Sequence, residues 1–101
     1  MPPDAEALGA ERVARIEAAL RAALDPLELR VEDESHLHRG HAGAKSGGGH
    51  FRVHIVARAF EGRSRLARHR LLYAALGDEM KSEIHALAIH ATAPGEADPL
   101  P

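Results

Sequence analysis

Two segments of alternating apolar and polar residues set the strongest limit on the fold. Over residues 27–32, leucine and valine alternate with charged residues, and the alternation returns over residues 50–58. A period of two places successive side chains on opposite faces of a strand, so each segment predicts a half-buried β-strand. We expect the two strands to pair antiparallel. The apolar face of the second strand consists of Phe51, Val53, Ile55 and Ala57.

Helical periodicity lies on both sides of this strand pair. Apolar residues recur every three or four positions over residues 8–24, and Asp25-Pro26 ends this first helix because the residue before proline disfavours the helical conformation. A break at Phe60-Glu61-Gly62 precedes a second helix, and a third strand is expected over residues 87–92. The apolar stripe of the second helix is expected to contain His69, Leu72, Tyr73, Leu76 and Met80.

The predicted element order is αββαβ, which defines an α+β fold. A strand, helix, strand connection favours a parallel pair with a right-handed crossover, so the second and third strands are expected to be parallel. Both helices should then cover one face of a mixed three-stranded sheet. We expect one domain over residues 8–93, between flexible termini at 1–7 and 94–101. The uncovered face is expected to carry Arg52, His54, Arg58 and His90 as surface residues.

Composition excludes several classes of protein. Hydrophobic residues make up 45% of the chain and charged residues 28%, which is typical of a globular domain. The net charge of −2 argues against attraction of the whole surface to nucleic acid. No cysteine is present, so any metal must be held by other ligands. No apolar run could cross a bilayer and the N-terminus does not resemble a signal peptide, so we expect a cytoplasmic protein with no membrane partner.

The segment between the first two strands contains most of the candidate chemistry. Residues 35–49 include five glycines and three histidines, and a loop of this length in a small domain is usually functional or disordered. The histidines His36, His38 and His41 could bind zinc, but a flexible loop offers no rigid support or general base. For the same reason Ser35 is not a credible nucleophile. The sequence therefore does not predict an enzyme.

Several short motifs occur along the chain. They are, in order, Asp33-Glu34-Ser35, His38, His50-Phe51, Phe60-Glu61-Gly62, Arg68-His69-Arg70 and Ile84-His85-Ala86-Leu87. Together they resemble the BolA family over residues 8–96. This resemblance implies a fold like a type II KH domain without its GxxG loop.

The resemblance also implies a function. BolA-like proteins bind monothiol glutaredoxins of the CGFS type and share a [2Fe-2S] cluster with them and with glutathione, in iron–sulfur trafficking or iron homeostasis. The motif positions imply His38 and His85 as the metal ligands of this chain, with His36 and His41 as alternative loop ligands. No cofactor is then expected in the isolated chain, which should be a monomer or a weak homodimer.

An alternative function is regulation of transcription by binding DNA through the KH-like scaffold, since some members of the family are described in this way. Four arginines near the second helix are the candidate contacts to a partner or to phosphate. One departure from the family pattern is Gly48-Gly49 before His50, which predicts a flexible entry into the second strand. His69 is expected to be structural. The four candidate arginines are Arg63, Arg65, Arg68 and Arg70.

Overall fold

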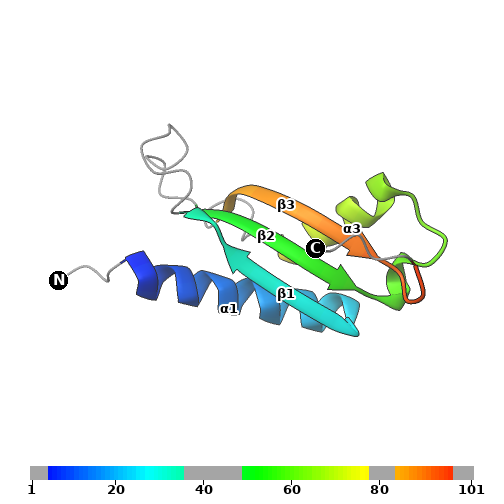
Figure 1. Cartoon of the computed structure of the whole chain (residues 1–101), viewed down its shortest axis with the longest axis horizontal. Helices are drawn as coiled ribbons and strands as arrows, with labels where there is room; N and C mark the ends of the chain where they lie inside the picture. The colour runs from blue at the N-terminus through cyan, green and yellow to red at the C-terminus, as the bar shows by residue number, and fades with distance from the viewer. Residues whose placement is uncertain (1–4, 36–48, 78–83, 97–101) are drawn as a thin grey trace.

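The computed structural model describes residues 5–35, 49–77 and 84–96, and within them it confirms the predicted order αββαβ (Figure 1). A short 3-10 helix, η2, occupies the predicted break before the second long helix. The elements are α1 (Ala5–Leu24), β1 (Glu28–Asp33), β2 (Gly49–Val56), η2 (Arg58–Phe60), α3 (Arg65–Leu76) and β3 (Ile84–Thr92).

The sheet has the order β1-β2-β3, with β2 in the centre. β1 and β2 are antiparallel, so that Val31 lies opposite Val53, and β2 and β3 are parallel, so that Val53 also lies beside Ile89. Helices α1 and α3 contact each other and pack on the same face of the sheet (Figure 1). The predicted mixed sheet with both helices on one face is therefore confirmed.

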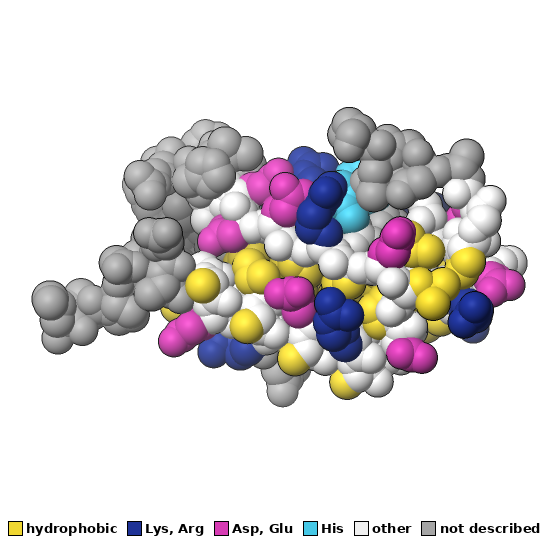
Figure 2. Space-filling view, turned by 60° about the horizontal axis from the view of Figure 1, so that its bottom comes forward, with side chains coloured by type: hydrophobic (Ala, Val, Ile, Leu, Met, Phe, Trp, Pro, Cys, Tyr) yellow, Lys and Arg dark blue, Asp and Glu magenta, His cyan; other side chains and the backbone are white. Residues whose placement is uncertain are grey.

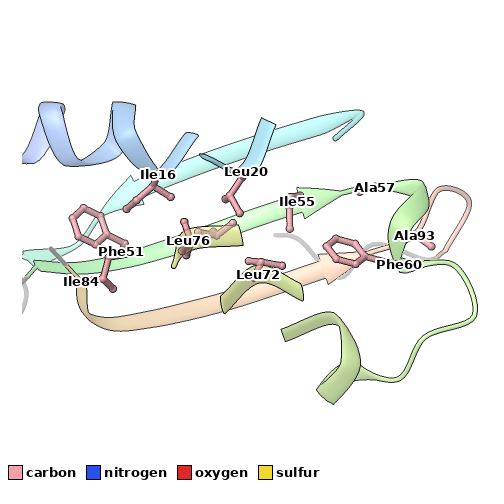
Figure 3. Packing of buried hydrophobic residues seen from close by; sticks show 11 residues of the cluster. Ile16, Leu20, Phe51, Ile55, Ala57, Phe60, Leu72, Leu76, Ile84 and Ala93 are labelled. Atoms are coloured by element: carbon pink, nitrogen blue, oxygen red, sulfur yellow. The ribbon is translucent and has the colours of Figure 1, made fainter. Parts of the chain in front are cut away.

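The core lies between this face and the two helices. Phe51, Val53 and Ile55 point from β2 toward the helices and are almost completely buried, as the alternation predicts. Phe60 of η2 is also fully buried and closes one end of the core (Figure 3). The helices contribute Ile16 and Leu20 from α1 and Leu72 and Leu76 from α3.

Strand β3 contains one extra residue near its start. Gly49 pairs with Ile84 but His50 pairs with Ala86, so His85 is the residue left over in the register. Ile84 is buried, and Leu87, three positions later, also packs against the core. In a regular strand, residues three positions apart face opposite sides of the sheet. The extra residue between Ile84 and Leu87 therefore allows both side chains to reach the core. His85 therefore occupies a β-bulge.

The core face of α3 differs from the predicted stripe. Leu72 and Leu76 are buried as expected, but Tyr73 is 43% exposed and His69 is only half-buried. The helix packs instead through Leu71 and Ala75, which lie on the other side of the Leu72–Leu76 line. The buried face of α3 is therefore rotated away from Tyr73. Met80 lies outside the described residues.

Ordered structure extends a few residues into both termini that were expected to be flexible. Helix α1 begins at Ala5, inside the segment 1–7 that was expected to be flexible, and alanine has the highest helix propensity. At the other end Glu96, in the predicted tail, is held by two hydrogen bonds from Arg68. Arg58 lies in η2, beyond the end of the sheet face on which it was expected. No helix among the described residues could span a membrane.

Neighbouring residues on α3 test the orientation of this helix. We expect Leu72→Ala to lower the free energy of unfolding by about 2–5 kcal/mol, because a fully buried leucine leaves a cavity. The control Tyr73→Ala, one residue away and exposed, should cost less than about 1 kcal/mol. Urea denaturation followed by circular dichroism measures both. Equal losses in the two variants would contradict this orientation of the helix.

Candidate functional site

Side chains of the Asp33-Glu34-Ser35 motif close the base of the segment 36–48. The Asp33 carboxylate accepts a hydrogen bond from the Ser35 amide at 2.9 Å. The Ser35 hydroxyl accepts one from the His50 amide at 3.0 Å, and the Glu34 amide donates to the His50 carbonyl at 2.7 Å. The segment therefore leaves and re-enters the sheet at one fixed point.

Two glycines make this close packing possible. A Cβ at Gly9 of α1 would collide with the Asp33 carboxylate, and a Cβ at Gly49 would lie 2.6 Å from the Phe51 ring. Gly49 is buried as the first residue of β2. The expectation of a flexible entry is therefore wrong for Gly49, because here glycine allows contact with a ring and does not serve to loosen the chain. Gly48 lies outside the described residues.

Of the predicted metal ligands, the structure describes only the backbone of His85. The backbone of His85 forms the bulge of β3 beside Gly49 and His50, while its imidazole is outside the described part of the structure. His36, His38 and His41 also lie outside the described residues. Among the described side chains, no group of three histidines and carboxylates is placed to hold a metal ion.

His50 is a residue at this end that sequence reasoning did not select as a site. It is only 9% exposed and lies across the β2–β3 pair from Ala86, next to the bulge. Its position directly before the buried Phe51 was the feature of the sequence that could have drawn attention to it.

The sheet face that the helices leave uncovered carries a network of charged residues and histidines from all three strands. Arg52 donates from Nε to Glu34 at 3.0 Å and from Nη1 to Nε2 of His90 at 3.1 Å. The hydrogen bond to Glu34 raises the pKa of Arg52. Because arginine can only donate, His90 accepts through Nε2, and a neutral His90 therefore carries its proton on Nδ1.

His54 lies at the centre of the same network and is not the surface residue that alternation suggested. Its side chain is 7% exposed, its Nε2 lies 3.1 Å from Glu32, and its ring stacks on His90 with centroids 4.8 Å apart. Neighbouring long side chains on a sheet can cover the central strand. Burial lowers the pKa of His54, with further contributions from the charges of Arg30 and His90. Figure 2 shows basic and acidic side chains gathered around histidine in this way.

A pocket of about 300 Å³ lies along the outer edge of β3, beside the first turn of α3. Ser64 caps this turn by accepting a hydrogen bond from the Ala67 amide at 3.1 Å. Three of the four predicted arginines line this pocket, and Arg70 lies outside it. The polar lining consists of Arg63, Arg65, Arg68, His69, His90 and Thr92.

Arg68 has a structural task within this pocket. Its guanidinium makes two hydrogen bonds of 2.7 Å to Glu96, and it also donates to the carbonyls of Arg63 and Ala91. The hydrogen bonds from Arg68 to Glu96, together with one from the Ala93 amide, lower the pKa of Glu96 to about 2. The Glu96 carboxylate and the Arg68 guanidinium are therefore both charged at pH 7. Arg68 thus ties the start of α3 to the end of β3, and sequence reasoning did not foresee this role.

Protonation of His54 should destabilise the fold. Because the pKa of His54 is lowered in the folded state, the unfolded chain binds the extra proton below about pH 6.5. The stabilisation that depends on neutral His54 is complete above that pH. Below it, the free energy of unfolding falls by at most about 1.4 kcal/mol per pH unit. Urea unfolding at pH 7.5 and 5.5 should show a smaller pH effect in His54→Gln than in the wild type. An unchanged pH effect in His54→Gln would contradict the prediction.

Comparison with known proteins agrees with this architecture over most of the chain. Residues 20–96 match the family model described as BolA-like protein. The solved BolA domain of SufE1 from Arabidopsis thaliana superposes with a TM-score of 0.75 at 49% identity, over 85% of this chain and 95% of that one. BolA1 from Mus musculus gives a TM-score of 0.70 at 42% identity, over 89% and 76% of the two chains.

Curated relatives include longer proteins. SufE-like protein 1 of Arabidopsis thaliana is 48% identical over 95 residues, which cover 89% of this chain but only 25% of that protein. The DNA-binding transcriptional regulator BolA of Escherichia coli is 46% identical over 76 residues, or 75% of this chain and 70% of that protein. The chain spans about half or less of the length of the first relatives, SufE-like protein 1 and chloroplastic BOLA1. On the family match and these identities, the chain belongs to the BolA-like family.

Proposed function

We propose that this chain is a binding partner of a monothiol CGFS glutaredoxin and contributes histidine ligands to a shared [2Fe-2S] cluster. The observation that carries the proposal is the bulge at His85. It lies at the end of the sheet where the hydrogen bond between Ser35 and His50 closes the base of the segment 36–48. Bulges are frequent next to functional sites because they change the direction of a side chain.

Covalent geometry supports a loop histidine as the second ligand. His38 is the third residue after Ser35, and an extended chain covers at most about 11 Å over three steps. Ser35 is held beside His50, at the end of the sheet that holds the backbone of His85, so this chain length supports a ligand at His38. His36 is closer to Ser35 along the chain and His41 is farther, so both stay alternatives.

The chemistry of the donor set explains why a partner is needed. Neutral imidazole binds iron in clusters in which two histidines replace two cysteines on one iron. This chain has no cysteine, so the thiolates for the other iron must come from another molecule. Glutaredoxin and glutathione would supply them. The role is then binding and transfer in iron–sulfur trafficking or iron homeostasis.

His85→Ala tests this assignment. In the complex formed with a monothiol glutaredoxin under anaerobic conditions, the variant should change the visible absorption and the EPR spectrum of the reduced cluster, because one iron loses its imidazole. The far-UV circular dichroism of the free variant should stay unchanged. His69→Ala serves as the control and should keep the wild-type spectra. His69 lines the pocket at the outer edge of β3, the edge that does not pair with β2.

Single alanine variants of His36, His38 and His41 then identify the loop ligand, and His38→Ala should show the largest spectral change. Wild-type spectra in His85→Ala would remove this residue as a ligand. Absence of any complex between the wild-type chain and the glutaredoxin would remove the proposed function as a whole.

DNA binding is a second candidate function. The relative from Escherichia coli is named a DNA-binding transcriptional regulator. Arg65 and Arg70 of α3 are exposed, and no ion pair joins either of them to a described carboxylate. Exposed guanidinium groups of this kind are suited to contact phosphate.

The salt dependence of DNA binding tests this candidate. If Arg70 contacts phosphate, Arg70→Gln should weaken binding to all duplex sequences alike and reduce the slope of log K against log salt by about 1. Fluorescence anisotropy with a labelled duplex at several salt concentrations measures the slope. Arg12→Gln on α1 is a control of equal charge change, and identical effects of the two substitutions would argue against specific contact by α3.

A further inference from the structure

We propose that the pocket between the outer edge of β3 and the first turn of α3 binds a small phosphate monoester. This site is separate from the end of the sheet that carries His85, and the proposal does not depend on the proposed function. It rests on three features of the pocket: its size, its unbalanced positive charge, and its hydrogen-bond donors.

The size of the pocket suits a small ligand. Its volume of about 300 Å³ is at the lower end of the range for pockets that bind small molecules. A phosphate group with a short organic part fills such a space. Ile89 and Ala91 add apolar surface to the lining, against which the organic part can pack.

The charge of the pocket is positive. Glu96 balances Arg68, but no described carboxylate pairs with Arg63 or Arg65. Arg63 uses its Nε to donate to the Ala59 carbonyl at 2.9 Å, a bond that fixes its side chain and leaves the terminal nitrogens of the guanidinium to bind a ligand. Two guanidinium groups at one pocket favour a doubly charged oxyanion, since each can bind two of its oxygens.

Backbone amides add donors on the same side. The Thr92 carbonyl accepts a hydrogen bond from the Ala57 amide, directly after β2, whereas the Ala91 carbonyl accepts one from Arg68 at the outer edge. Because the N–H and C=O of one strand residue point the same way, the Ala91 amide also faces the outer edge of β3. On the opposite wall, helix α3 has no acidic residue in its first turn, and the amides of its first two residues have no acceptor within the helix. These groups supplement the arginines and do not define the site alone.

The position of Arg68 explains how the site can be rigid. Its hydrogen bonds hold the Arg63 carbonyl on one wall and the Ala91 carbonyl on the other. The ion pair with Glu96 fixes the guanidinium itself, whose side chain is 12% exposed. The two walls are therefore held together in the free protein, so that binding of a ligand costs little conformational entropy.

Titration of the whole chain, free of cluster and partner, tests the proposal. Two probes, inorganic phosphate and glycerol phosphate, are added at constant ionic strength, with chloride as the reference anion, and amide shifts are followed by NMR. We expect saturable shifts at Arg65, Leu66 and Ala91. Arg65→Gln should weaken binding about tenfold or more, the range for one charged hydrogen bond.

Arg58→Gln is the control, because it removes the same charge from an exposed arginine outside the pocket, and it should change the affinity less than about twofold. Shifts that do not saturate, or that chloride reproduces, would overturn the proposal. Equal losses in Arg65→Gln and Arg70→Gln, together with tighter binding of a short DNA duplex, would assign these arginines to nucleic acid and overturn it as well.

Discussion

Burial of the central strand holds this small domain together. Phe51, Val53 and Ile55 of β2 lie between two neighbouring strands and beneath both helices, and they are at most 2% exposed. β1 and β3 are joined only through β2, one antiparallel and one parallel to it. Because the starts of parallel strands lie at the same end of a sheet, this pairing also places His85 beside the base of the segment 36–48.

The two ends of β3 are held by different side-chain contacts. Near its start the Asp33 and Ser35 side chains accept hydrogen bonds from the Ser35 and His50 amides, which hold Ser35 beside His50. Near its end the Arg68–Glu96 pair fixes the first turn of α3 to the strand. The histidine network of the open face lies between them, and His90 belongs both to that network and to the pocket. A substitution in the network on the open face can therefore alter the pocket by displacing His90.

Hydrophobic periodicity predicted most of the fold, for reasons visible in single residues. The alternation in β2 reflects a face that is buried along its whole length, so Phe51 and Val53 could be placed correctly. The face of α3 was misplaced because Tyr73 counts as apolar in a periodic pattern although its hydroxyl favours the rim. The burial of His54 was missed because alternation assumes that polar positions face water, whereas neighbouring strands supply Glu32 and His90 to cover it. Arg68 could not be recognised as structural without Glu96, which is 28 residues away in sequence.

The bulge in β3 has a consequence for how this chain can change during evolution. The neighbours Ile84 and Ala86 keep their partners in β2, whereas position 85 has none in the register. The core contacts at the start of β3 come from Ile84 and Leu87, and the strand pairing comes from Ile84 and Ala86. A substitution at position 85 can therefore leave both the pairing and these core contacts in place.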